Sequence, residues 1–203
     1  ELIPSGETSS YRSNPERLSE FALSRRDPQY VSRSKVMRQI ERDREAGKAL
    51  PEEVLNVYAA LTKAGVKNDP AHTDIGSTIF ANMPGDGSAR EQAASCQKVL
   101  GGFANICYQF ATKRYRSNCI NWGILPFTLD EGTPFDYESG DCVFVPHIRQ
   151  AVEQGREDIP AKVICRDGSV HDLLLHIKGL TADEKEIILD GCLMNYYAAR
   201  NKE

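Results

Sequence analysis

The sequence lacks three features that point to common classes of protein. It has no run of about 20 apolar residues, the length that a membrane-spanning helix needs, and no signal-peptide pattern at its start. It also has no excess of basic residues, because 25 Lys and Arg stand against 29 Asp and Glu, a net charge of −4. An acidic balance argues against a broad nucleic-acid-binding surface. We therefore expect a cytoplasmic protein without a membrane or nucleic-acid partner.

A metal-binding pattern is missing as well. No two of the six cysteines form a Cys-x-x-Cys pair, and the four histidines show no ligand spacing. Several cysteines lie within apolar runs, as Cys107 does in Asn105-Ile-Cys-Tyr108. That setting is typical of reduced, buried thiols. We expect no metal site in this chain.

The length and composition fit one domain with a sizeable core, since the chain has 203 residues, of which 40% are hydrophobic. We predict a single domain over residues 1–203, with an N-terminal loop and helical part over 1–76 and a β/α core over 77–203. The first residue is Glu1 and the start is rich in turn-forming residues. We therefore expect the chain to be a fragment of a longer protein.

Helical patterns dominate the N-terminal part. Asn14 followed by Pro15 predicts a capped helix that ends at about Arg25. The range 30–64 predicts two further helices with a break at Gly47.

From residue 77 on, short β-rich runs alternate with helical ones. Strands are predicted over 78–81, 104–110 and 124–129, and helices over 88–100 and 113–122. This β-α-β-α-β order implies parallel strands with right-handed crossovers. The fold class is therefore α/β.

The C-terminal third predicts an added antiparallel layer. Short strands are expected over 142–145, 161–166 and 169–176, and Asp167-Gly168 predicts a type I′ hairpin between the last two. Thr181-x-x-Glu184 is a capping box, which opens one final helix with a buried stripe from Ile187 to Tyr196.

The segment 84–94, Pro-Gly-Asp-Gly-Ser-Ala-Arg-Glu-Gln-Ala-Ala, joins the first predicted strand to the first core helix. In such sheets ligands bind outside the carboxyl ends of the strands. Gly85 and Gly87 allow a ligand to approach the backbone, the helix N-terminus offers unpaired N–H groups, and Arg90 adds a full positive charge. These features predict an anion site.

Two interpretations of Ser88 remain open at this point. Ser88-x-x-Glu91 is a capping box, so the serine could simply cap its helix. Alternatively it acts as a base, whose alkoxide the helix N-terminus and nearby cations would stabilise.

Basic residues outside this segment also allow two interpretations. Arg12, just before the first helix, is either an anion ligand or a solvated loop arginine. Lys113, Arg114 and Arg116 surround Tyr115 after the second strand. They could contact nucleic acid, for which four residues are a weak signal, or they could hold a polycarboxylate anion or contact a partner domain.

Three separated segments resemble the C-terminal swivel domain of the aconitase superfamily. They are 85–94, then Phe110-Ala-Thr-Lys-Arg-Tyr-Arg-Ser-Asn118, then Asn121-Trp-Gly-Ile-Leu-Pro126. The family patterns are close to G-x-G-S-S-R-E-H-A-A, S-F-A-R-I-x-x-x-N and N-x-G-[IL]-L-P. Tyr11-Arg-Ser-Asn14 also resembles an element that places a substrate arginine in homoaconitase-like and isopropylmalate-isomerase-like members. The resemblance implies a three-layer β/β/α swivelling domain with a βαβαβ core and extra antiparallel strands.

The resemblance also implies a function. Members of the superfamily are hydro-lyases that dehydrate and rehydrate a hydroxy-polycarboxylate at a four-iron four-sulfur cluster. By this resemblance Ser88 is the catalytic base, Arg90 and Arg12 grip substrate carboxylates, and Gly87 and Ala89 contact the substrate. The chain has Ala89 where the pattern has its second serine and Gln92 where it has histidine, which leaves the substrate open.

Three arrangements are compatible with the resemblance. The chain is first expected to be the swivel domain of an aconitate-hydratase-type enzyme, inactive alone, whose cluster is bound by domains 1–3 of the parent protein, which are absent here. The second is a free-standing small subunit of an isopropylmalate-isomerase-type dehydratase that pairs with a large subunit. The third is an inactive family member in iron- or RNA-responsive binding, which Ala89, Gln92 and the basic residues over 113–116 would favour.

Overall fold

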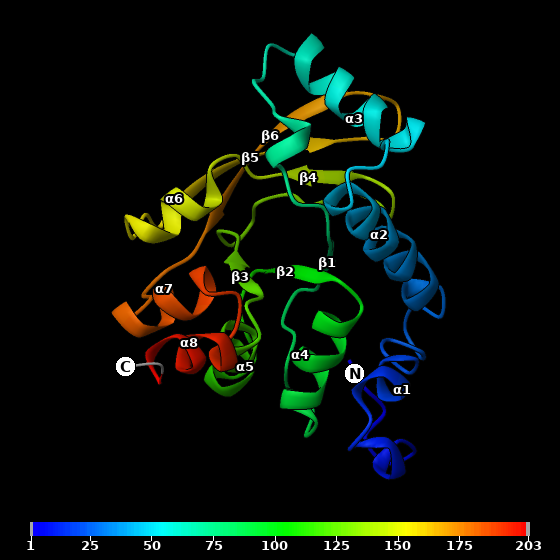
Figure 1. The fold of residues 1–203 in the computed structure, drawn as a ribbon, viewed down its shortest axis with the longest axis vertical. Coiled ribbons are helices and arrows are strands. Elements are labelled where there is room, and N and C mark those ends of the chain that lie inside the picture. The colour runs from blue at the N-terminus through cyan, green and yellow to red at the C-terminus, as the bar shows by residue number, and fades with distance from the viewer. Residues whose placement is uncertain (1, 202–203) are drawn as a thin grey trace.

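The computed structural model describes residues 2–201, and Figure 1 shows their arrangement. The part before the sheet is helical, as predicted. Its elements are η1 (Ser9–Tyr11), α1 (Pro15–Ser19), α2 (Tyr30–Glu45), α3 (Glu52–Lys63) and η2 (Pro70–His72).

Six strands form one sheet with the order β1-β2-β3-β6-β5-β4. The strands are β1 (Ser77–Phe80), β2 (Gly102–Cys107), β3 (Leu125–Thr128), β4 (Cys142–Phe144), β5 (Asp158–Ile164) and β6 (Val170–His176). The first three strands pair in parallel, and the last three pair antiparallel. β3 and β6 meet through the pair Thr128 and His176, so the sheet curls at this joint.

The helices of the core are α4 (Arg90–Val99), α5 (Lys113–Asn121), α6 (Ile148–Glu153), α7 (Ala182–Leu189) and α8 (Leu193–Arg200). In Figure 1 the antiparallel strands lie above β1–β3, and α4 and α5 lie below them. Side chains of both strand groups fill the upper space, among them Ile106, Phe127, Val163 and Leu175. Tyr115, Ala94 and Leu18 belong to a second cluster, which packs α4 and α5 against the N-terminal segment. The predicted α/β class with three β/β/α layers is confirmed.

Two local predictions in this region of loops and turns are wrong. The helix that begins at Pro15 ends at Ser19 rather than near Arg25, and Leu23 adopts a left-handed φ of 53°. The β5–β6 hairpin is not type I′, because only Gly168 of the Asp167-Gly168 pair has a positive φ. The N–H of Gly168 donates to Cys165 O at 2.9 Å, which is the pattern of a type I turn followed by a left-handed glycine.

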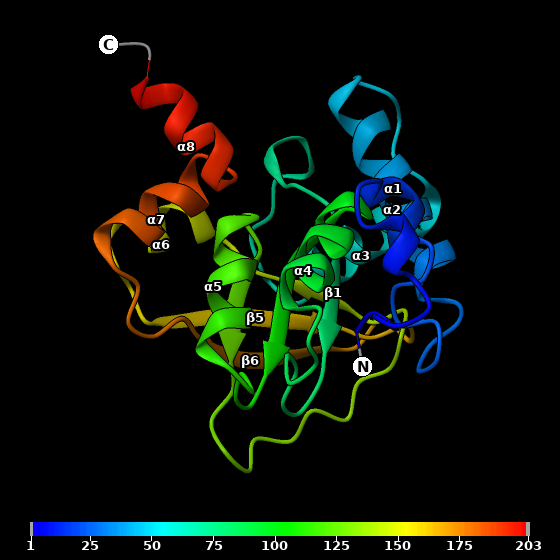
Figure 2. The same ribbon diagram turned by 90° about the horizontal axis from the view of Figure 1, so that it is seen from below.

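The C-terminal helix is also corrected, because two helices replace the single one that we predicted. Thr181 and Glu184 do form the predicted capping box, but α7 ends at Leu189 and Gly191 turns the chain with a φ of 92°. The stripe from Ile187 to Tyr196 is therefore interrupted. α8 projects from the body of the molecule in Figure 2, and it contains no buried residue within its described length.

No helix among residues 2–201 combines the length and the apolar character that crossing a membrane requires.

Candidate functional site

The turn after β1 is shaped by the ring of Tyr115. Gly85 has a φ of +97°, and a Cβ placed there would lie 2.3 Å from Tyr115 Cδ1. Tyr115 is fully buried, so its ring cannot easily move aside. Only glycine satisfies both the dihedral angle and the close approach.

Hydrogen bonds join this turn to the loop that follows β2. The Gly85 carbonyl accepts from Thr112 Oγ1 at 3.1 Å and from Arg90 Nε at 3.3 Å. Ala111 N donates to Pro84 O at 2.9 Å, and Thr112 Oγ1 also accepts from Tyr115 N at 3.2 Å as the N-cap of α5. These hydrogen bonds hold the loop after β1 against the loop after β2, and we call the loop after β1 the braced turn.

A buried hydrogen-bonded network around Asn105 supports the braced turn through Tyr115. Asn105 Nδ2 donates to Tyr115 Oη at 3.0 Å and to Cys119 Sγ at 3.3 Å, while its Oδ1 accepts from Gln97 Nε2 at 2.8 Å. Burial is the main cause that raises the pKa of Tyr115 well above its ordinary value. The phenol is therefore a neutral structural partner, and it fixes the ring against which Gly85 packs.

The structure brings four of the five predicted site residues to one cavity of about 50 Å³. Gly87, Ser88, Ala89 and Arg90 all line it. Ser88 and Gly87 are exposed, and Arg90 is half-buried. A cavity of this size holds a water molecule or two, whereas small-molecule sites usually enclose roughly 300–1,000 Å³.

The capping-box interpretation of Ser88 is wrong. α4 begins at Arg90, its N-cap is Ala89, and no side chain caps it. The Ser88 hydroxyl instead lies 3.2 Å from the hydroxyl of Ser5. Among the described residues, no side chain therefore caps the first turn of α4, and unpaired N–H groups at a helix start are what an anion site requires.

Arg12 is not among the residues that line this cavity. It follows η1 and is exposed. Its neighbour Tyr11 stacks on Phe21 at 5.6 Å between ring centroids and carries the Arg17 guanidinium over its face. The role of Arg12 as a carboxylate ligand stays a prediction.

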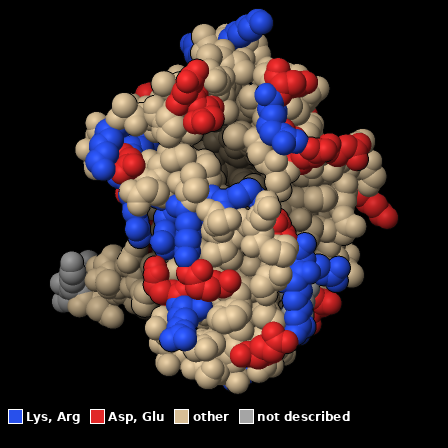
Figure 3. All heavy atoms as spheres, turned by 90° about the vertical axis from the view of Figure 1, so that its right-hand side faces the viewer, with Lys and Arg blue, Asp and Glu red and all other residues tan. Residues whose placement is uncertain are grey.

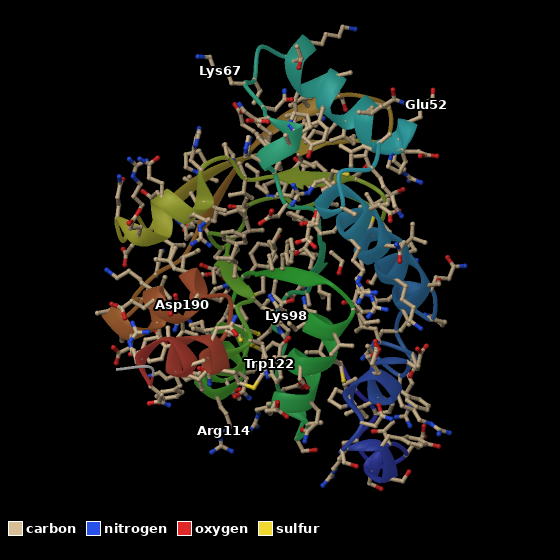
Figure 4. The ribbon with its side chains drawn as sticks, in the orientation of Figure 1. Glu52, Lys67, Lys98, Arg114, Trp122 and Asp190 are labelled. Carbon is tan, nitrogen blue, oxygen red and sulfur yellow. The ribbon has the colours of Figure 1, made fainter. Side chains whose placement is uncertain are left out.

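The basic residues around Tyr115 divide into two kinds. Arg116 donates to Lys178 O at 2.9 Å and lies 3.5 Å from a Glu184 carboxylate oxygen, so it joins α5 to the segment before α7 and to α7 itself. Lys113 and Arg114 are exposed, and Figure 4 shows Arg114 pointing away from the body of the molecule. On the face drawn in Figure 3, basic and acidic side chains are interspersed.

Within residues 2–201 no group of three or more His, Cys, Asp or Glu side chains is placed to hold a metal ion. The thiols of Cys96, Cys107 and Cys119 are fully buried. Burial raises the pKa of Cys96 and Cys107 to about 12 and that of Cys119 to about 11. Because the thiolate is the metal-binding form, these cysteines are poor ligands.

Sequence reasoning missed the contributions of Ser5, Thr112 and Tyr115. Thr112 precedes a helix start and could have been recognised as an N-cap. Nothing in the sequence links Ser5 to Ser88, because the contact spans 83 positions and depends on the fold.

A family model described as the Aconitase C-terminal domain matches residues 63–132 of this chain. Aconitate hydratase A of Bradyrhizobium diazoefficiens is 29% identical over 147 residues, which is 71% of this chain and 16% of that protein. The 3-isopropylmalate dehydratase small subunit of Metallosphaera sedula is 33% identical over 118 residues, which is 58% of this chain and 62% of that protein. This chain thus spans less than two thirds of either relative.

Among solved structures, a 3-isopropylmalate dehydratase from Methanocaldococcus jannaschii matches with a TM-score of 0.40 and 27% identity, covering 72% of this chain and 79% of that one. The braced turn and the three motif segments that resemble the aconitase patterns all lie within the range matched by the family model.

Proposed function

This chain is related to the aconitase superfamily through the C-terminal domain matched over residues 63–132, and from that premise we propose that it supplies catalytic side chains to a hydro-lyase. In the proposal it is the swivel domain of an aconitate-hydratase-type enzyme. The reaction is the reversible dehydration and hydration of a small hydroxy-polycarboxylate. Both curated relatives, a hydratase and a dehydratase, are named for reactions of this class.

One observation carries the proposal. Ser88 and Arg90 lie two residues apart on a braced glycine turn and line the same cavity at the start of α4. The serine hydroxyl does not cap the helix, so it is available for chemistry. The turn is rigid because the Gly85 carbonyl is held from two sides.

In the proposed reaction Ser88 acts as the base that removes the proton next to a substrate carboxylate. A serine alkoxide needs stabilisation, which the N–H groups of the first turn of α4 and the charge of Arg90 provide. Arg90 Nε is engaged by the Gly85 carbonyl, which orients the guanidinium plane. Its terminal nitrogens then offer a carboxylate the paired geometry that suits arginine.

The four-iron four-sulfur cluster implied by the family does not fit the side chains of this chain. The described residues provide no group of three or more His, Cys, Asp or Glu side chains that could hold a metal ion, and three of the six thiols are buried and hard to ionise. No step of the proposed chemistry therefore passes through the cluster here. In the proposal it belongs to domains 1–3 of a parent protein or to a large subunit.

The open shape of the site supports a shared active centre. A cavity of about 50 Å³ cannot enclose a polycarboxylate, yet Gly87 and Ser88 are exposed to an approaching surface. A partner surface would complete the enclosure, and in the proposal Arg12 binds a substrate carboxylate. We expect the isolated chain to be inactive.

The test uses the full-length gene product, prepared without oxygen and with its cluster reconstituted, and follows hydration of cis-aconitate. We expect Ser88→Ala to abolish turnover and Arg90→Lys to raise KM, because lysine cannot offer a bidentate fork. Ser10→Ala, which removes an exposed hydroxyl outside the cavity, is the matched control and should match the unsubstituted protein. Full turnover by the Ser88→Ala protein would rule out the proposed base.

A second arrangement is favoured by the 33% identity to a 3-isopropylmalate dehydratase small subunit. Here the chain would be a separate subunit that pairs with a cluster-bearing large subunit. It predicts hydration of 2-isopropylmaleate that appears only when a large subunit is added. An in-frame upstream continuation of the gene would instead support the fused domain.

A further inference from the structure

The N-terminal segment of the described chain lies against the turn that carries Ser88. Leu2, Ile3 and Ser5 line the same cavity as Gly87, Ser88 and Arg90. Within it, Ser5 Oγ lies 3.2 Å from Ser88 Oγ, and either hydroxyl can donate in this pair. The two serines come from distant parts of the sequence and meet only through the fold.

Ser5 is held in place by its neighbours on both sides. Ile3 is only 4% exposed and belongs to the hydrophobic cluster that also contains Ala93 and Tyr115. The carbonyl of Leu2 accepts from Leu23 N at 2.9 Å. On the other side, the buried Thr8 donates its hydroxyl to Pro4 O at 2.9 Å. Ser5 therefore faces Ser88 from an anchored segment.

We propose that Ser5 is a positioning residue that donates a hydrogen bond to Ser88 Oγ and thereby stabilises its alkoxide. The inference rests on the proposed function, because it matters only if Ser88 is a base. An alkoxide can accept hydrogen bonds but cannot donate one, so Ser5 must be the donor in the reactive state. Hydrogen bonding to the charged form of an acid favours that form.

The proton balance leaves Ser5 unchanged. The substrate proton next to the carboxylate moves to Ser88 Oγ, which becomes a neutral hydroxyl. The electron pair of the broken C–H bond is delocalised into the substrate carboxylate. Ser5 keeps its own proton throughout and transfers nothing.

The other groups that line the cavity leave the proposed Ser88 alkoxide in need of a neutral hydrogen-bond donor. Asp86 and Arg90 come from the turn itself and Tyr115 from α5, while the described part of the N-terminal segment adds no charged group to the lining. Asp86 disfavours a second negative charge close by. Arg90 is partly engaged by the Gly85 carbonyl. The Ser5 hydroxyl adds a neutral donor within hydrogen-bond distance of the Ser88 oxygen.

The test compares Ser5→Ala, Ser5→Thr and Ser5→Cys in the full-length, cluster-reconstituted protein with cis-aconitate as substrate. We expect kcat to fall on the order of 10- to 100-fold in Ser5→Ala, the effect of losing a hydrogen bond to a charged group. KM should stay nearly constant, because in the proposal Ser5 contacts Ser88 and not the substrate. Ser5→Thr keeps the hydroxyl and should restore most of kcat, and Ser5→Cys, a weaker donor of similar size, should fall between the two.

Ser9→Ala, an exposed serine of the same segment, is the matched control and should leave kcat unchanged. Thermal unfolding of each variant shows whether the segment is still folded. If Ser5→Ala unfolds, the comparison between Ser5→Thr and Ser5→Cys still decides, because they differ mainly in donor strength. Equal kcat in these two, or a Ser5→Ala variant that changes KM alone, would overturn the inference.

Ser88→Ala in the same assay separates this inference from the function on which it rests. If Ser88→Ala abolishes turnover while Ser5→Ala has no effect, Ser5 is not a positioning residue and the proposed function survives. If Ser88→Ala is fully active, or the unsubstituted protein has no turnover with cis-aconitate or 2-isopropylmaleate, the Ser5 inference and the proposed function are both refuted.

Discussion

Replacing Gly85 with alanine should destabilise the protein strongly, because two costs coincide at this position. The φ of +97° is unfavourable for any residue with a Cβ, at about 1–2 kcal/mol. The new Cβ would also lie 2.3–2.5 Å from three atoms of Tyr115. Relieving such overpacking typically costs a further ~1–3 kcal/mol. Here a shift of the Tyr115 ring would also strain the hydrogen bond from Asn105 to the Tyr115 hydroxyl. We expect the free energy of unfolding to fall by about 2–5 kcal/mol.

Urea unfolding followed by circular dichroism measures this loss, and two glycines serve as controls. Gly47 has a φ of +76° and no atom lies within 4 Å of the place its Cβ would take, so Gly47→Ala should cost only the dihedral strain of about 1–2 kcal/mol. Gly87 has neither a positive φ nor a close neighbour, so Gly87→Ala should leave stability nearly unchanged. The reasoning is refuted if Gly85→Ala loses no more stability than Gly47→Ala.

Three further predictions concern stability. Gly123→Ala should be more damaging than Gly132→Ala in thermal unfolding, because its Cβ would lie 1.9 Å from the Gly191 carbonyl oxygen while Gly132 has open space; similar melting temperatures would contradict this. Tyr115→Phe should lower the free energy of unfolding by about 1–3 kcal/mol in urea, because the buried amide of Asn105 loses an acceptor, and an unchanged midpoint would argue against it. The three buried thiols stay neutral in the folded protein, whereas the same thiols in the unfolded chain ionise above pH 9.0. The free energy of unfolding should therefore keep its full value below that pH and decrease between about pH 9 and 12, by up to ~1.4 kcal/mol per pH unit for each thiol. Urea unfolding at pH 8 and pH 10 checks the sign, and equal or greater stability at pH 10 would contradict it.

The parallel half of the sheet could be predicted from the sequence because each element has a clear local pattern. β1 and β3 lie within one residue of their predicted bounds, and the helices between the strands begin and end close to the predicted positions. β5 begins at Asp158, three residues earlier than predicted. The prediction missed this start because Asp158 and Pro160 are poor strand formers. Proline is tolerated there because β4 pairs only with residues 162–164 of β5.

Only part of the candidate site could be predicted, because some of its residues belong to one local motif and others are brought together by the fold. The motif segment over 84–94 carries its own signal, and the resemblance to the aconitase superfamily that it supported is confirmed. The state of the Ser88 hydroxyl depends on where α4 begins, and the sequence allowed a cap that the structure does not form. The contact with Ser5 and the burial of Tyr115 arise from tertiary packing, which no local pattern encodes.

The most direct test of the central claim follows the substrate proton itself. The full-length, cluster-reconstituted protein is incubated with substrate in D2O, and deuterium incorporation next to the carboxylate is measured for the unsubstituted protein, Ser88→Ala and Ser10→Ala. The account predicts incorporation with the unsubstituted protein and with Ser10→Ala, and none above background with Ser88→Ala. Incorporation at the full rate by folded Ser88→Ala protein would show that another group removes the proton.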